Sequence, residues 1–253
     1  GRPRDHPRRT GLHPRRRAPP LVPGVSSRRN LWLGIACAIT GSIAFSGKPV
    51  LVKAVYQYGV DTTTLLTLRM LFSAPLFLLM AWWAGRGQAR LTAEQWRRVL
   101  WVGFSGYYLA SFLDFAGLQF ISASLERLIL YLNPTVVLLL GWRLYGRRIQ
   151  PQQALAMAIS YTGVMVVFGH ELHFDGWVTL LGGGLVFASA ISYAVYLLMS
   201  GELVKQVGSM RLVGLASLVA SGFCLLQFAV MRPMSAAWVA PEVIQLSLFN
   251  AVF

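Results

Sequence analysis

The sequence predicts an all-α integral membrane protein: a multi-span helical bundle of two inverted five-span repeats, the second of them incomplete. Three observations carry this prediction. Hydrophobic residues make up 55% of the 253-residue chain and charged residues only 13%, whereas soluble domains carry about a quarter charged residues. Long apolar runs follow one another along the chain, and part of the sequence repeats loosely at an offset of 150 residues.

The apolar runs set the number of spans, because a helix needs about 20 mostly apolar residues to cross the hydrocarbon core of a membrane. An eighth run begins near Val243, after seven that cover residues 31–56, 62–84, 98–118, 121–145, 150–169, 177–200 and 211–231. The links between the runs are short, which favours antiparallel neighbours packed as one bundle. We therefore expect seven spans plus the start of an eighth, and no soluble domain.

Residues 1–30 form a basic tail. They hold nine Arg and one Asp and so supply +8 of the formal net charge of +14. An Arg-rich tail could bind nucleic acid or anionic lipid. This one lacks Met and also resembles upstream sequence translated ahead of a true start. Tails of this composition are usually disordered, so we expect a disordered tail and no nucleic-acid partner.

Loop charges predict the orientation, because cytoplasmic loops are enriched in Lys and Arg. The basic tail and nine further basic residues fall on one side: Arg86, Arg90, Arg97, Arg98, Arg143, Arg147, Arg148, Lys205 and Arg211. On the other side, the loops near 57–61, 119–122 and 170–176 contain neither Lys nor Arg, and 232–242 contains only Arg232. We therefore expect a protein of the inner (plasma) membrane with a cytoplasmic amino terminus.

Two features recur at nearly the same spacing. The pentapeptide LVKAV at 51–55 recurs as LVKQV at 203–207. A ladder of small residues in the first span recurs in the sixth: Gly34, Ala38 and Ser42, then Gly184, Ala188 and Ser192. An odd number of spans separates the copies, so the second copy crosses the membrane in the opposite direction, as in many secondary transporters. We predict a first repeat over 31–169 and an incomplete second repeat over 177–253, which would continue for roughly 65 residues beyond Phe253.

Five charged residues lie deep inside spans, where charge is costly and marks candidate functional sites; Lys53 is set aside, because it lies closer to the outer water and can snorkel. They are Lys48, Arg69, Asp114, Glu126 and Arg127. At about 1.5 Å of rise per residue, all five fall in the outer half of their spans at similar depths, so they can pair with one another. Two interpretations stay open: a polar substrate site with a titratable acid, or an interhelical ion-pair clamp. The surplus of one positive charge would suit a carboxylate-bearing substrate.

The fourth span carries a helix breaker. Pro134 removes an intrahelical hydrogen bond and so predicts a kink next to Tyr131 and Asn133. Such a kink could open a cavity or act as a hinge, and plain packing is the alternative, because Pro is tolerated in membrane helices.

Two other spans carry polar residues at matching depths. Tyr107 and Ser111 share a helical face with Asp114, at spacings of four and three residues. Tyr193 and nearby hydroxyl groups line the sixth span, where helix packing is the alternative reading. The complete candidate pathway comprises Lys48, Arg69, Asp114, Glu126, Arg127, Tyr131, Asn133, Pro134 and Tyr193.

Catalytic and metal sites are not predicted. The four histidines, at positions 6, 13, 170 and 173, lie outside the spans, so no buried nucleophile has a histidine base. The loop GHELHFD (169–175) has a His-x-x-His spacing but lacks the helical His-Glu-x-x-His pattern of zinc enzymes. Cys37 and Cys224 lie far apart in apolar runs and imply no disulfide framework. We expect neither an enzyme nor a bound metal or cofactor.

Three stretches of the chain resemble one family of membrane proteins. FLDFAGLQFISASLERLILYLNPTVVLLLGW (112–142) strongly resembles the third-to-fourth span hairpin of EamA-type permeases in the drug/metabolite transporter (DMT) superfamily. GKPVLVKAVYQYGVDTTTLLTLRMLFSAPLFLLM (47–80) resembles their first hairpin, and ALAMAISYTGVMVVFG (154–169) their fifth span. The resemblance covers about 31–231. Where many members have Gly-Glu after the fourth span, this chain reads Gly146-Arg147.

The resemblance implies ten spans in two inverted repeats around a cavity that opens alternately to either side. It also implies export or exchange of amino acids, other metabolites and drugs, usually without ATP. The residues that match the family pattern are Lys48, Arg69, Glu126, Arg127 and Pro134.

We therefore expect a secondary transporter that exports small polar metabolites such as amino acids. Glu126 or Asp114 would carry a coupling proton, Lys48 or Arg127 would hold an anionic group, and Pro134 would flex. The expected partners are membrane lipid, a small-molecule substrate and the coupling proton, and a homodimer is left open. The alternatives are an importer of the same fold and a non-transporting membrane scaffold or truncated remnant.

Overall fold

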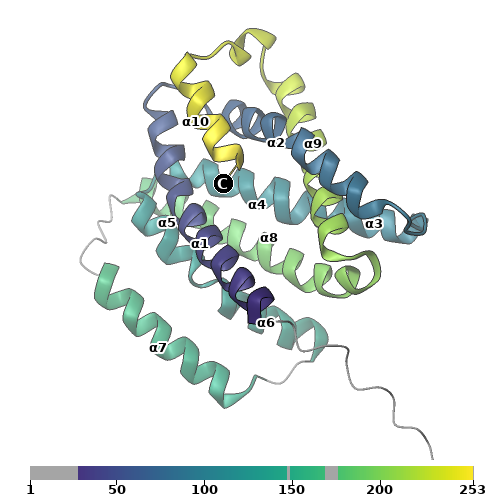
Figure 1. Ribbon diagram of the computed structural model, residues 1–253. Helices are drawn as coiled ribbons and strands as arrows, with labels where there is room; N and C mark the ends of the chain where they lie inside the picture. The colour runs from purple at the N-terminus through teal and green to yellow at the C-terminus, as the bar shows by residue number, and fades with distance from the viewer. Residues whose placement is uncertain (1–27, 147–148, 169–175, 253) are drawn as a thin grey trace, which may run out of the picture. The chain divides into compact units, whose positions relative to one another are not determined.

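A computed structural model describes residues 28–146, 149–168 and 176–252, and within them all regular secondary structure is helical (Figure 1). Most of the basic tail, the four histidines and Arg147 lie outside the described residues. The elements are α1 (Arg28–Tyr56), α2 (Thr62–Gly85), α3 (Ala93–Val102), the π-helix η1 (Gly103–Leu109), α4 (Ala110–Leu118), α5 (Ala123–Leu130), α6 (Asn133–Tyr145), α7 (Pro151–Phe168), α8 (Trp177–Val207), α9 (Ser209–Met231), the 3-10 helix η3 (Met234–Ala237) and α10 (Pro241–Val252).

Helices occupy every span that the sequence predicts. Six helical segments of the described chain are long and apolar enough to cross a membrane: Trp32–Tyr56, Thr62–Gly85, Ala93–Leu118, Ala123–Tyr145, Trp177–Val207 and Ser209–Met231. The other two are shorter, α7 with 18 residues and α10 with 12, and α10 covers the start of the eighth predicted span. The predicted all-α multi-span class is therefore confirmed.

The chain divides within α1 into two compact units, residues 1–42 and 43–253. The described part of the first unit, residues 28–42, is helical throughout. In the second unit, α2 packs along α9, α4 packs along α8, and α10 packs against α2 (Figure 1). The pair α2 and α9 are the second spans of the two predicted repeats.

Small and hydroxyl-bearing residues bring these helices together, since apolar surface alone gives helices little reason to associate in lipid. Gly117 of α4 lies directly against α8, where a Cβ atom would come within 2.7 Å of a backbone oxygen. Ser189 Oγ of α8 donates a hydrogen bond to the Ala110 carbonyl oxygen of α4 at 2.7 Å. Thr67 Oγ1 of α2 donates to the Cys224 carbonyl oxygen of α9 at 3.2 Å. Side-chain hydroxyls therefore connect the same helix pairs that pack most closely.

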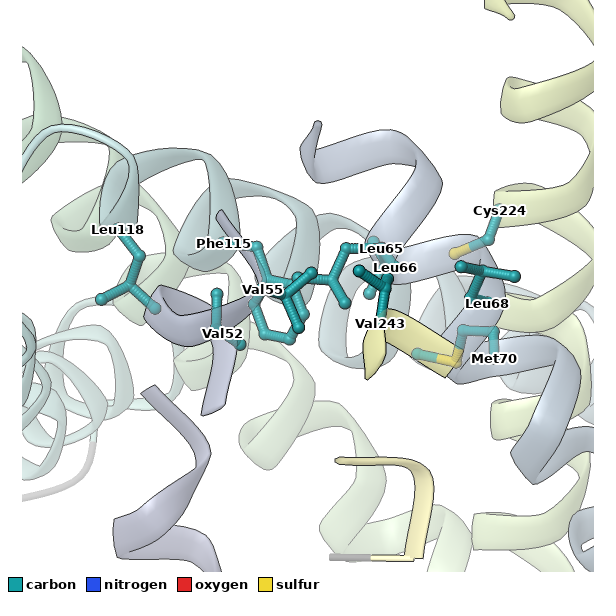
Figure 2. Close-up of a cluster of buried hydrophobic side chains, with 10 residues drawn as sticks. All are labelled: Val52, Val55, Leu65, Leu66, Leu68, Met70, Phe115, Leu118, Cys224 and Val243. Carbon is teal, nitrogen blue, oxygen red and sulfur yellow. The ribbon is translucent and has the colours of Figure 1, made fainter. Parts of the chain in front are cut away.

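The two larger of three apolar clusters join most helices of the second unit. The first joins α1, α2, α4, α9 and α10 through ten buried side chains (Figure 2): Val52, Val55, Leu65, Leu66, Leu68, Met70, Phe115, Leu118, Cys224 and Val243. The second joins α3, α8 and α9 through Val99, Val102, Leu203, Val207, Leu212 and Ala216. The third span contributes to both clusters, through Phe115 and Leu118 in one and Val99 and Val102 in the other. Its two halves therefore pack into different clusters, although α9 contributes to both.

The third span is not the regular helix that the sequence predicts. It runs through α3, η1 and α4, and η1 is a π-helix, in which each turn holds an additional residue. Gly106 lies in η1 against α8, where a Cβ atom would overlap the Tyr196 side chain. The wider turn changes the phase of the residues around it. Consequently Tyr107 contacts Tyr196 of α8, whereas Asp114 pairs with a residue of α1.

Candidate functional site

A buried ion pair joins α1 to α4. Lys48 Nζ donates a hydrogen bond to Asp114 Oδ2 at 2.9 Å, and the two side chains are 10% and 5% exposed. The other carboxylate oxygen, Asp114 Oδ1, is buried and accepts no hydrogen bond from the described residues. Removing one partner of a buried pair leaves an uncompensated charge and costs about 3–5 kcal/mol. This pair therefore stabilises the packing of α1 against α4, whether or not it also has a role in transport.

A second acid is buried on α5. Ser122 caps this helix by accepting a hydrogen bond from the Leu125 backbone N–H. Glu126 follows in the first turn and is 0% exposed. Its Oε2 lies 3.4 Å from Arg127 Nε, and neither Glu126 oxygen accepts a hydrogen bond within the described part of the chain. The Glu126 carboxyl interacts with the carboxyl of Asp114 and with the Lys48 ammonium. The two buried acids therefore belong to one electrostatic cluster.

Two of the cations lie close to the ring of Phe115 on α4. Lys48 Nζ lies 4.7 Å and Arg69 Cζ 5.6 Å from its centroid. Cations at such distances are attracted to the ring electrons. Arg69 comes from α2, and its Nε donates a hydrogen bond to the Asn250 carbonyl oxygen of α10 at 3.1 Å. Arg69 and Asp114 also interact electrostatically. The structure thus gathers the five intramembrane charges, from α1, α2, α4 and α5, into one cluster beside the first apolar cluster.

Two residues of α10 were not found by sequence reasoning. Ser247 and Asn250 are buried, at 0% and 1% exposure. Ser247 Oγ and both polar atoms of the Asn250 amide have no hydrogen-bond partner among the described residues. With Val243 of the first apolar cluster they have the spacing of one helical face, i, i+4 and i+7. In the sequence, the only sign of these residues is a Ser and an Asn within a largely apolar run.

The fourth span is interrupted where the sequence predicts a kink. Helix α5 ends at Leu130 and α6 begins at Asn133, with Pro134 in the first turn of α6. This position suits proline, because the first turn of a helix leaves its backbone N–H groups unpaired. Tyr131 lies in the break and is 47% exposed. Asn133 Oδ1 is buried and finds no hydrogen-bond donor in the described chain. The break therefore places an unpaired polar atom inside the fourth span.

Tyr193 belongs to an aromatic group rather than to the charged cluster. It is 39% exposed on α8, and its ring lies 5.2 Å from that of Tyr196. The Tyr196 ring lies 5.3 Å from that of Tyr107, and their hydroxyl oxygens are 3.3 Å apart. This group packs with the second apolar cluster through Tyr107 and Tyr196. Its link to the candidate pathway stays a prediction.

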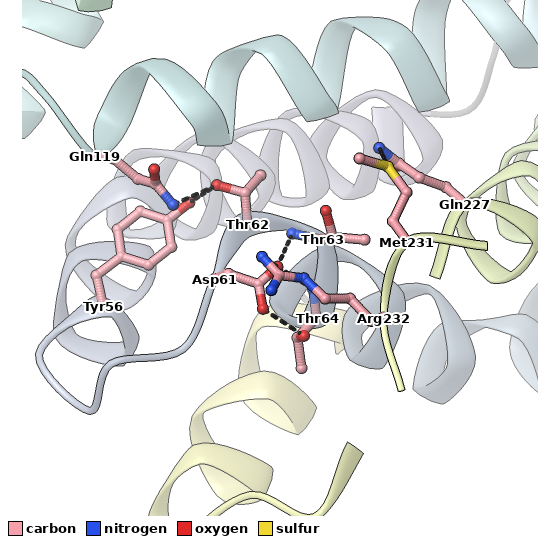
Figure 3. Close-up of polar contacts among 9 residues, drawn as sticks. All are labelled: Tyr56, Asp61, Thr62, Thr63, Thr64, Gln119, Gln227, Met231 and Arg232. Atoms are coloured by element: carbon pink, nitrogen blue, oxygen red, sulfur yellow. Dashed lines mark hydrogen bonds and ion pairs between the residues drawn. The ribbon is translucent and has the colours of Figure 1, made fainter. Parts of the chain in front are cut away.

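Polar contacts also join the helix ends on the side that the loop charges assign to the outside (Figure 3). Asp61 caps α2 by accepting hydrogen bonds from two backbone N–H groups, and its Oδ2 lies 3.2 Å from Arg232 Nη2. The Tyr56 hydroxyl donates to the Phe115 carbonyl oxygen at 2.6 Å, and Gln119 Nε2 donates to Thr62 Oγ1 at 2.8 Å. These contacts join α1, α2 and α4 just beyond the charged cluster.

An apolar multi-span bundle with acids and bases buried together defines a polytopic membrane protein with an intramembrane polar site. The chain belongs to the EamA-like transporter family, which it matches over residues 32–169, more than half of its length. The break before Pro134 and all five clustered charges lie within the matched residues. The predicted family is therefore confirmed.

Similar proteins are transporters by name. The uncharacterized transporter YcbK of Bacillus subtilis is 29% identical over 196 residues, which cover 74% of this chain and 60% of YcbK. An uncharacterized transporter of Archaeoglobus fulgidus is 23% identical and is covered over 58% of its length, from 68% of this chain. The chain thus spans about three fifths of the length of these relatives. A solved crystal structure superposes with a TM-score of 0.54 at 18% identity, over 84% of this chain and 79% of its own, which supports the fold.

Proposed function

We propose that this protein is a secondary active transporter that exports small polar metabolites, such as amino acids, across the inner membrane. Transport would proceed by alternating access, coupled to a proton on the Glu126–Asp114 carboxyl pair. The observation that carries this proposal is the state of Glu126, which is fully buried and accepts no hydrogen bond from the described residues. A carboxylate in such a place is costly unless it is paired or protonated.

A proton could form a hydrogen bond between carboxyl oxygens of these two acids that no described donor reaches. On Glu126 it could be donated to the unpaired Asp114 Oδ1, while Lys48 remains bonded to Asp114 Oδ2. The other charges around the pair are Lys48, Arg69 and Arg127, and all three favour the ionised form of the acids. The ammonium group of an amino-acid substrate would favour the ionised form of the acids, so substrate and proton would compete for the site, as proton-driven export requires. Substrate binding and proton binding would then be coupled.

The proposed substrate class follows from charge and from unpaired polar atoms. Three cations face two acids in the cluster, so a single carboxylate-bearing molecule would balance it. Ser247 and Asn250 offer an unpaired hydroxyl and amide on the helix that Arg69 contacts. Uncharged groups of this kind bind the remaining polar atoms of a small metabolite. The break at Pro134 supports a hinge that would open the site alternately to either side.

The decisive experiment is substrate-linked proton movement by the protein in liposomes, with Glu126→Gln as the test variant. The assay would screen a panel of radiolabelled amino acids at several pH values and follow internal pH. We expect Glu126→Gln to abolish transport or its dependence on pH in a protein that still folds and still unfolds cooperatively on heating. The matched control is Glu202→Gln, because Glu202 is an exposed acid paired with Lys205. Unchanged, pH-dependent transport in Glu126→Gln would refute the proton-carrier role.

The same preparations separate the alternatives. An importer would move substrate in the opposite direction in vesicles of known orientation. A scaffold held together by ion pairs would transport nothing, and exchanging Glu126 with Arg127 would preserve its stability, because both charges stay in the cluster. A transporter should instead lose activity on that exchange, since the acid would leave its position beside Asp114.

A further inference from the structure

A separate cavity opens at the other end of α2, far along the helix from Arg69. It has a volume of about 500 Å³ and is bounded by the carboxyl end of α2, the start of α3 and the start of α9. These three ends lie on the side that the loop charges assign to the cytoplasm. Its apolar wall is formed by Leu78, Leu215 and Leu218. The cavity is therefore amphiphilic, with an apolar wall inside the bundle end and a polar mouth.

Arginines form the mouth of this cavity. Arg211 Nη1 donates to Gln88 Oε1 at 3.2 Å and to the Ala89 carbonyl oxygen at 3.1 Å, which holds its guanidinium in place. Arg90 lies beside it in the lining. The guanidinium of Arg86 lies 3.5 Å from the ring centroid of Trp82, another lining residue.

In the described part of the chain, these arginines have no acidic partner. Among the described residues, no carboxylate forms an ion pair with Arg86, Arg90 or Arg211. The two acids of the neighbouring helix ends are paired elsewhere, Glu94 with Arg98 and Glu202 with Lys205. The mouth thus carries uncompensated positive charge and fits an anion.

The position of the cavity identifies the kind of anion. Trp82 and Trp96 line it, and tryptophan gathers at the level of the lipid headgroups. Basic pockets between helix ends on the cytoplasmic side bind anionic lipid headgroups. The lining of the cavity changes from leucine to tryptophan to arginine towards its mouth. A phospholipid changes in the same order, from its acyl chain through its glycerol region to its phosphate.

We propose that the cavity between α2, α3 and α9 is a binding site for an anionic phospholipid. The phosphate is held by Arg90 and Arg211, and one acyl chain lies along the leucine wall. This site is distinct from the charged cluster and does not depend on transport. Its occupant would fasten the start of α9 to the end of α2, the helix pair that packs along the bundle.

The test is binding of phosphatidylglycerol to the purified protein, measured by native mass spectrometry from detergent, with phosphatidylcholine, which is zwitterionic and has no net charge, as the comparison. The first variant is Arg90→Gln, because Arg90 is exposed and its loss leaves the hydrogen bonds of Arg211 in place. We expect its affinity for phosphatidylglycerol to fall about five-fold, as for one basic contact to a lipid phosphate. Arg211→Gln should weaken binding further. The matched control is Arg143→Gln, an exposed arginine on the same predicted side that does not line the cavity.

Each other outcome would overturn the proposal. Equal affinity of the wild type and Arg90→Gln for phosphatidylglycerol would place the lipid elsewhere. Equal binding of both lipids would show that the site does not select for a net negative charge, against the proposed anionic lipid. Displacement of the lipid by millimolar glycerol 3-phosphate, with equally tight binding of that soluble anion, would indicate a phosphate site without a lipid. If Arg211→Gln does not fold, the affinity of Arg90→Gln for phosphatidylglycerol, compared with that of the wild type, still tests the proposal.

Discussion

Replacing Asp114 with asparagine removes the carboxylate that balances two cations, the buried Lys48 and the partly buried Arg69. Lys48 Nζ loses an ion pair of 2.9 Å between side chains that are 10% and 5% exposed. Arg69 loses its electrostatic interaction with the same carboxylate. Because a buried charge left without its partner costs about 3–5 kcal/mol, we expect Asp114→Asn to destabilise the protein by that amount.

Lys48→Met should cost less than Asp114→Asn. Once the lysine is gone, the Asp114 carboxylate still faces Arg69, and the methionine keeps most of the packing of the lysine stem against Phe115. The double variant Lys48→Met/Asp114→Asn removes both ions of the pair and so leaves neither of them buried without its partner. It should therefore be more stable than Asp114→Asn. The assay is reversible unfolding in mixed micelles, read as a double-mutant cycle.

Two results would refute this reasoning. If Asp114→Asn costs less than about 1 kcal/mol, the pair behaves like an exposed salt bridge. If the effects of the two single variants simply add in the double variant, the two side chains do not interact energetically. A fully stable double variant that has lost transport would separate the structural role of the pair from a functional one.

Three further predictions test the geometry. Asp61→Ala should destabilise α2 by about 1 kcal/mol through loss of its cap, whereas Arg232→Ala should cost less, because its ion pair with Asp61 is partly exposed; equal losses in chemical denaturation would contradict this order. Gly106→Ala should lower stability by about 1–3 kcal/mol because its methyl group overlaps Tyr196, and an unchanged melting temperature would exclude the close contact in η1. Pro134→Ala should slow hydrogen exchange at residues 131–133 and slow transport without loss of stability, since a continuous fourth helix can then form; exchange as fast as in the wild type would show that the break does not depend on proline.

The sequence predicts the spans well because the membrane imposes one simple rule on them. Every backbone polar group must be paired inside the segment, so long apolar runs become helices. The break before Pro134 also followed from local chemistry, since proline cannot donate the missing hydrogen bond. The common depth of the intramembrane charges followed from the helical rise alone.

Partners within the cluster could not be predicted in this way. Depth places Lys48 level with both Asp114 and Glu126, but only helix packing decides that Lys48 bonds Asp114 and leaves both Glu126 oxygens without a hydrogen bond. The π-helix η1 was missed because no local signal marks it: its glycines matter through contacts with α8 and α9. Ser247 and Asn250 look like ordinary polar residues until α10 packs against α2 and buries them.

The sequence by itself therefore determined the class of protein, the positions of its helices and the set of charges that must be neutralised inside the membrane. These properties depend on composition and on the fixed rise of a helix, which act along a single segment. The tertiary structure decided which charges pair, which acid is left without a donor, and where arginines without acids surround an apolar cavity. Those features arise between segments distant in sequence, because the rotation of each helix about its axis is set by close packing against its neighbours.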